Sequence, residues 1–93
     1  MKIIKRDGTE VEFNVDKIIM ALTKANNRVE TPQKLSENEI SSISTHVKEI
    51  AKGLTRALTV EEIQDVIERD IMRLGKYELA KRYITYRYNR SLA

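Results

Sequence analysis

The chain has 93 residues, which is enough for one domain with a single modest hydrophobic core. It has no cysteine, which excludes a disulfide framework, a zinc ribbon and thiol chemistry within these residues. Its 17 Lys and Arg residues against 14 Asp and Glu residues give a net charge of +3, too mild to argue for nucleic-acid binding by itself. No apolar run approaches the roughly 18 residues of a membrane span, and the first residues lack the apolar stretch of a signal peptide. We therefore expect a cytoplasmic protein with no membrane partner.

Residues 2–13 predict a β-hairpin. Two stretches rich in β-branched residues flank Asp7-Gly8, a dipeptide that tolerates the positive φ angles of a type I′ turn. With a two-residue turn, Ile4 pairs with Val11 on the face that packs against helices, and Lys5 stands on the other face opposite Glu10. A hairpin alone is marginal in water, so it needs the rest of the chain.

Four helices are predicted after the hairpin, because apolar residues recur there at spacings of three and four. Ser36 with Glu39, and Thr59 with Glu62, are capping boxes at two of the helix starts. No linker or internal repeat divides the chain. We expect one domain over residues 1–93 of the α+β class, mostly α, with an N-terminal two-stranded β-hairpin packed on a four-helix bundle. The helices are expected at about residues 15–27, 37–53, 60–74 and 76–92.

Patterns that indicate catalysis are missing from the sequence. The single histidine, His46, has no cysteine or second histidine with which to complete a metal site, and we interpret it as a surface or boundary residue. The acidic pairs around Glu61 and Glu68 lie where helix capping and solvation explain them. The three glycines are too scattered for a phosphate loop or a dinucleotide fingerprint. We expect no catalytic residue and no protein metal site.

A set of basic residues is the remaining candidate for a site. Lys5 and Arg6 lie at the hairpin tip, and Lys17 lies in the first turn of the first helix. Either Arg87 or Arg90 returns towards them from the last helix. A nucleoside triphosphate carries about four negative charges, which several cations and the exposed amides of a helix start would suit. On spacing alone, a solvated tip whose lysine pairs with an acidic neighbour explains the same residues.

The opening sequence IIKRDG at residues 3–8, with Phe13 and the DKI sequence at 16–18, resembles the start of the ATP-cone domain. That domain is the regulatory nucleotide-binding module at the N-terminus of many ribonucleotide reductases. The resemblance continues through residues 58–66 and the closing tyrosines of the last helix. Residues 86–93 look most like the end of the cone in anaerobic, glycyl-radical (class III) ribonucleoside-triphosphate reductases, where a catalytic domain follows.

The resemblance implies a set of phosphate-binding cations. Lys5, Arg6 and Lys17 would contact the triphosphate, in agreement with the basic residues singled out above. Arg90 matches a position where many members keep a phosphate-binding cation on the last helix. Many members also have a glutamate in the second strand where this chain has Val11, which puts the contact to the base or ribose at that position in question.

The resemblance also implies contacts to the base and the sugar. The backbone of Ile3 and Ile4 and the side chain of Asn14 would lie near the adenine. Thr59 and Gln64 would approach the ribose and phosphates. From the residues alone, a helix cap is an equally good explanation of Asn14, and a plain helix-surface position is an equally good explanation of Gln64.

The function that the resemblance implies is allosteric control of a ribonucleotide reductase by bound ATP or dATP. Mg²⁺ would accompany the phosphates, and the chain itself would perform no chemistry. Its partners would be adenine nucleotides and a reductase catalytic domain, in cis or in a neighbouring subunit. The alternative is a small basic module that binds nucleic acid or another protein, in which tyrosines of the last helix stack on bases. Nucleic acid is the less favoured partner, because helical spacing places at least Tyr83 in the core.

Overall fold

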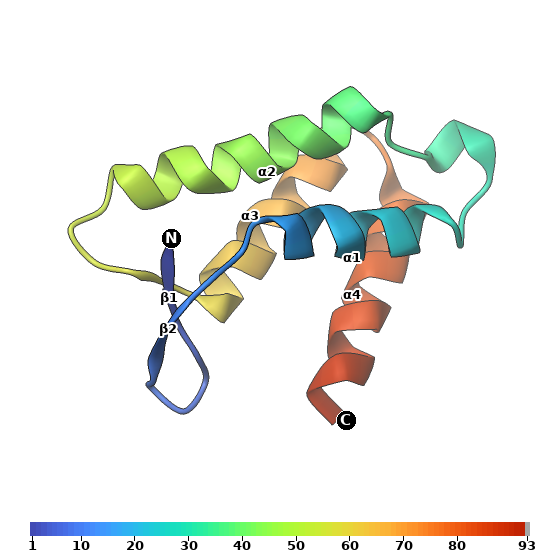
Figure 1. Cartoon of the computed structure of the whole chain (residues 1–93). Helices are drawn as coiled ribbons and strands as arrows, with labels where there is room; N and C mark the ends of the chain where they lie inside the picture. Colours follow the sequence, from blue (N-terminus) through green and yellow to red (C-terminus); the bar gives the residue numbers. More distant parts are fainter. Residues whose placement is uncertain (93) are drawn as a thin grey trace.

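The computed structural model describes the backbone of residues 1–92 and the side chains of residues 1–87. Within this range, short strands at the N-terminal end lie beside four helices, so the predicted mostly-α class with a hairpin on four helices is confirmed (Figure 1). A single 3-10 turn, η1, joins the first two helices. The elements are β1 (Lys2–Ile4), β2 (Glu10–Glu12), α1 (Asp16–Asn26), η1 (Thr31–Gln33), α2 (Glu37–Lys52), β3 (Leu58–Thr59), α3 (Val60–Arg73) and α4 (Tyr77–Leu92).

The sheet has a third strand that the sequence did not predict. Its order is β2-β1-β3, with β1 antiparallel to β2 and parallel to β3. β3 places Leu58 beside Ile3 and Thr59 beside Ile4. Because α3 begins at the residue after β3, this pairing fixes the start of α3 against the hairpin.

The hairpin register differs by one residue from the predicted register. Ile3, not Ile4, pairs with Val11, and Ile4 rather than Lys5 stands opposite Glu10. Ile3 is accordingly buried in the core, whereas Ile4 is only half-buried. The predicted pairings of Ile4 with Val11 and of Lys5 with Glu10 were therefore wrong. Lys5 lies just past the end of β1 and is exposed.

The register is set by a longer turn than the predicted two-residue turn. Lys5 N donates to Thr9 O at 2.8 Å, and Gly8 N donates to Lys5 O at 2.9 Å, so three residues form the loop. Gly8 takes a φ of 86°, which matches the αL position of a three-residue hairpin loop. The Asp7 carboxylate accepts from Thr9 N at 2.9 Å. Hydrogen bonding by the Thr9 side chain, and to a lesser degree by this backbone N–H, lowers the pKa of Asp7.

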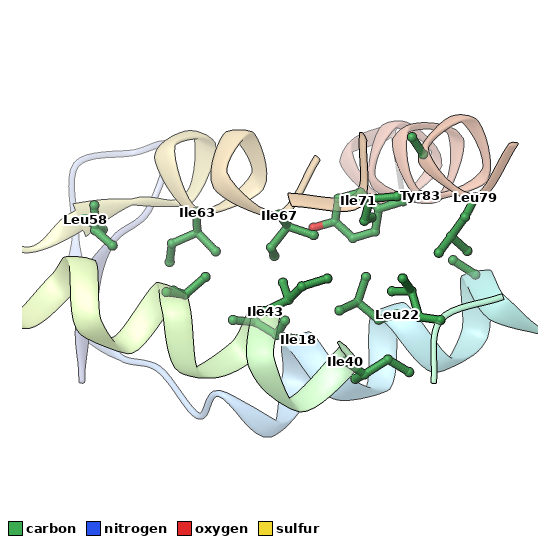
Figure 2. Close-up of a cluster of buried hydrophobic side chains, with 14 of the residues drawn as sticks. Ile18, Leu22, Ile40, Ile43, Leu58, Ile63, Ile67, Ile71, Leu79 and Tyr83 are labelled. Atoms are coloured by element: carbon green, nitrogen blue, oxygen red, sulfur yellow. The ribbon is translucent and has the colours of Figure 1, made fainter. Parts of the chain in front are cut away.

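The core joins all four helices to the sheet (Figure 2). α1 packs on α2 and α4, and α3 packs on the same two helices. Tyr83 of α4 is buried as its spacing predicts, and burial raises the pKa of its hydroxyl. Among residues 1–92, no helix is long and apolar enough to cross a membrane. The most deeply buried large side chains are Leu22, Val47, Ile67, Ile71 and Leu79.

Candidate functional site

The hairpin tip and the first turn of α3 meet in space although they are far apart in sequence. The parallel pairing of Ile4 with Thr59 aligns the chain ends that follow each strand. Arg6 Nε then donates to Glu61 Oε1 at 2.8 Å. Arg6 of the tip therefore lies at a helix N-terminus, where backbone N–H groups and the helix dipole favour anions.

The start of α3 is built by a capping box. Thr59 Oγ1 accepts from Glu62 N at 3.1 Å, and Glu62 Oε1 accepts from Thr59 N at 2.9 Å. Arg56 donates from both Nη atoms to the two carboxylate oxygens of Glu62 at 2.7 Å each. These bonds, with Arg56 contributing most, lower the pKa of Glu62 to about 2. The Thr59 hydroxyl accepts the cap bond and still has its own proton to donate to a ligand.

Lys5 and Lys17 are both exposed on the surface. Neither ammonium makes a hydrogen bond or an ion pair with the side chains described for residues 1–87. Lys17 lies in the first turn of α1, at the far end of β2 from the hairpin tip. Both ammonium groups are thus accessible to a ligand, but they lie at opposite ends of β2.

Gln64 lies half-buried on α3, just past the first turn. Its Oε1 atom is buried and accepts no hydrogen bond within the described part of the chain. Buried side-chain oxygens normally have a donor, so a buried acceptor without one is a candidate ligand contact. Further along the same helix, Glu68 pairs with Arg87 Nη1 at 2.7 Å, which ties α3 to α4.

The residues expected to contact the adenine make local or sheet hydrogen bonds in the structure. Asn14 Oδ1 accepts from Asp16 N at 2.9 Å, a local turn that supports the start of α1. Both edges of β1 carry sheet partners, so the backbone of Ile3 and Ile4 lies within the ladder. The Arg90 side chain lies outside the described residues. Roles for these four residues in nucleotide binding stay predictions.

A cavity at the base of the hairpin does not coincide with the tip. It has a volume of about 730 Å³ and lies among the hairpin base, the C-terminal end of α2 and the loop that leads to β3. Its cationic side chains are Lys2, Lys48, Lys52 and Arg56. Among the predicted nucleotide-binding residues whose side chains are described, Asn14 is the one that lines it. Arg56 in this cavity is already held by Glu62.

Sequence reasoning missed the partners of the site. Arg6 and Glu61 are 55 residues apart, and no local pattern marks them as a pair. The capping box was visible in the sequence, but the forked Arg56 contact to it was not. His46 Nδ1 lies 2.6 Å from Asp70 Oδ2, so the predicted boundary histidine joins α2 to α3. Among the residues whose side chains are described, no group of three or more His, Asp or Glu side chains is placed to hold a metal ion.

Ribonucleotide reductases contain segments similar to nearly the whole chain. The ribonucleoside-diphosphate reductase subunit alpha of Chlamydia pneumoniae is 39% identical over 99 residues, which cover 98% of this chain and 9% of that protein. The vitamin B12-dependent ribonucleoside-diphosphate reductase of Thermoplasma acidophilum is 35% identical, over 96% of this chain and 12% of that protein. The anaerobic ribonucleoside-triphosphate reductase of Haemophilus influenzae is 32% identical, over 98% and 13% respectively. The chain thus spans roughly a tenth of the length of these relatives.

The family comparison agrees with the resemblance of the opening sequence. The family model described as the ATP cone domain matches residues 1–92, from the hairpin through α4. Anaerobic reductases, which the last residues resemble, are among the relatives. A match over this extent, on a hairpin that carries Lys-Arg-Asp-Gly to the start of a capped helix, shows that the chain belongs to the ATP-cone domain family.

Proposed function

We propose that this chain is a regulatory domain that binds ATP or dATP and through the bound nucleotide controls a ribonucleotide reductase. The observation that carries the proposal is the parallel pairing of β1 with β3, which sets the Lys5-Arg6 tip beside the first turn of α3. Cations next to free helix N–H groups are the chemistry that binds polyphosphate. Family membership and the reductase relatives support the regulated partner, as a catalytic domain in cis or in a neighbouring subunit.

The phosphates would be bound by Lys5, Arg6 and Lys17. Each charge-assisted hydrogen bond contributes roughly 1.5 to 3 kcal/mol, so three of them are enough to select a triphosphate. Arg90 is a fourth candidate on the last helix. Mg²⁺ would arrive on the phosphates themselves, since phosphate oxygens and water supply most of its usual ligands.

The sugar is where ATP and dATP differ, by one ribose hydroxyl. Thr59, with a hydroxyl proton to donate, and Gln64, with its buried oxygen, are the candidates to contact it. A buried group that loses its partner costs about 1 to 3 kcal/mol, which is also the size of a typical allosteric coupling energy. One hydroxyl therefore suffices to distinguish an active state with ATP from an inhibited state with dATP.

Val11 is the position at which this chain departs from many members of the family, which carry a glutamate there. It is half-buried and pairs with Ile3 across the hairpin. We propose that the contact made by that glutamate is either absent here or made by another residue, such as Asn14 or Gln64.

The direct test is calorimetric titration of the chain with ATP, dATP, GTP and a short oligonucleotide. The proposal expects saturable binding of ATP and dATP, weaker binding of GTP and weaker binding of the oligonucleotide. Failure of both adenine nucleotides to bind at millimolar concentration would overturn it.

A groove between α1 and α4 favours the second candidate function, binding of an anionic macromolecule. It has a volume of about 380 Å³, its charged lining residues are Lys24, Arg28 and Arg82, and Tyr86 lies at its wall. Lys24 Nζ lies 6.0 Å from the centroid of the Tyr86 ring. Oligonucleotide binding that exceeds ATP binding and is lost in Arg82→Ala would favour this function over the first.

A further inference from the structure

One acidic residue, Glu61, contacts the proposed phosphate-binding residue Arg6. Glu61 Oε1 accepts the hydrogen bond from Arg6 Nε at 2.8 Å, and both side chains remain about half exposed, 49% for Glu61 and 53% for Arg6. The pair links the hairpin tip to the first turn of α3. It is thus an ion pair that solvent, or a ligand, can reach.

The position of the pair follows from the sheet. β1 and β3 are parallel, so the chain leaves both strands at the same edge of the sheet. Arg6 is two residues past Ile4, in the hairpin loop, and Glu61 is two residues past Thr59, in the first turn of α3. The Glu61 carboxylate also lies at the helix N-terminus, where the helix dipole favours negative charge. It therefore occupies the kind of position that a phosphate would take.

We infer that Glu61 competes with the triphosphate for Arg6, so that a nucleotide must displace this carboxylate in order to bind. The inference rests on the proposed function, because it takes Arg6 as a phosphate contact. Glu61 then sets the affinity of the site by holding its arginine in the absence of ligand. Glu61 is therefore a determinant of affinity. Its negative charge repels the phosphates, and its role is to hold Arg6 when no nucleotide is bound.

The neighbouring carboxylates of α3 have other tasks. Glu62 is fixed by the capping box and by the two bonds from Arg56. Glu68 is more buried, at 18% exposure, and its pair with Arg87 ties α3 to α4. Asp65 lies one turn past Glu61, is exposed, and approaches Arg87 only at 4.0 Å. Of the acidic residues described on α3, Glu61 is the one that contacts the hairpin tip.

The test compares Glu61→Gln with the wild-type chain in calorimetric titrations with ATP and with inorganic triphosphate. Exposed ion pairs are weak, so the gain should be about two- to fivefold tighter binding of both ligands. Asp65→Asn removes the same charge from the same helix without touching Arg6, and should tighten binding less. Equal or weaker binding by Glu61→Gln, or an equal gain in Asp65→Asn, would overturn the inference.

A second arm shows whether Glu61 acts through Arg6. In an Arg6→Ala background, Glu61→Gln should give no more than the small gain of Asp65→Asn, because the arginine that the carboxylate holds is gone. The full gain in that background would overturn competition for Arg6. Wild-type chain that binds neither ATP nor triphosphate would instead contradict the proposed function, so the two failures are distinguishable.

Discussion

The starts of α2 and α3 use the same local device and come to lie in different surroundings. Ser36 Oγ accepts from Glu39 N at 3.1 Å, and Glu39 Oε1 accepts from Ser36 N at 2.8 Å. Thr59 and Glu62 repeat both bonds at 3.1 and 2.9 Å. α2 follows a 3-10 turn and a short loop, whereas α3 follows directly from a strand of the sheet.

That difference separates a plain helix cap from the proposed phosphate site. At the start of α3, β3 brings in the hairpin tip with Arg6, and Arg56 binds the capping glutamate. Within the part of the chain with described side chains, no cation contacts Glu39 at the start of α2. A capping box needs four consecutive residues, but a phosphate site needs a neighbour supplied by the fold.

The largest effect is expected on triphosphate binding when Lys5→Ala is combined with Lys17→Ala. Loss of two charge-assisted contacts removes roughly 3 to 6 kcal/mol of binding free energy, a fall in affinity of at least about a hundredfold. The matched control is Lys34→Ala with Lys48→Ala, two exposed cations that flank and follow the start of α2. Calorimetry should show near wild-type ATP binding in the control. A loss confined to the control would place the site at the large cavity beside α2.

The next largest effect is a loss of stability when one core side chain is truncated, either in β3 or in α2. Leu58→Ala in β3 and Ile40→Ala in α2 remove side chains that are 2% and 7% exposed. Each should lower the free energy of unfolding in urea by about 2 to 4 kcal/mol, because a cavity is left in the core. Leu58→Ala should also weaken ATP binding under conditions where it is folded, since β3 positions the start of α3. Equal ATP affinity in both folded variants would contradict the role of β3 in positioning the nucleotide site.

A smaller effect is expected from removing the caps themselves. Ser36→Ala and Thr59→Ala should each lower the free energy of unfolding by about 0.5 to 2 kcal/mol, because each leaves a helix N–H unpaired. ATP affinity should fall in Thr59→Ala alone. If Ser36→Ala weakened ATP binding as much, the loss would reflect stability and Thr59 would have no role as a ligand.

The smallest effect is expected on the stability of the fold at low pH. The pKa of Glu62 is about 2 in the fold against an ordinary 4.5, so its ionised form stabilises the fold above about pH 5, and this contribution is lost as the pH falls towards 2. Glu62→Gln should therefore flatten the decline of stability between about pH 5 and pH 2, followed by circular dichroism in urea. Glu39→Gln is the control, because it alters a capping box that has no arginine. An unchanged acid profile in Glu62→Gln would mean that Arg56 does not stabilise this carboxylate.

Local features of this fold could be predicted from the sequence. The two capping boxes and the buried Tyr83 depend on residues within a few positions of one another, and the structure has them. The helical stripes are confirmed only in part, because Ile19, Leu74 and Ile84, which the spacing assigns to them, are exposed. The hairpin was also predictable, because Asp7-Gly8 marks its turn. Its register was not, since the choice between a two- and a three-residue loop depends on which face the core buries.

Features that join distant segments could not be predicted. β3 has two residues, too few for a pattern, and it exists because β1 is beside it. The Arg6–Glu61 pair depends on that strand, as does the position of Thr59 next to the tip. Lys5 and Arg6, the proposed phosphate contacts, were singled out by resemblance and charge, but the helix start that Arg6 contacts was visible only in the fold.

The most direct test of the site is an ATP titration followed by backbone amide shifts in NMR spectra of the chain. Residues 5–8 and 59–62 should show the largest changes, with small changes at residues 36–39, whose capping box is built the same way. Largest changes at residues 48–57, beside the large cavity, or equal changes at the two helix starts would contradict the assignment of the nucleotide site to the hairpin tip and α3.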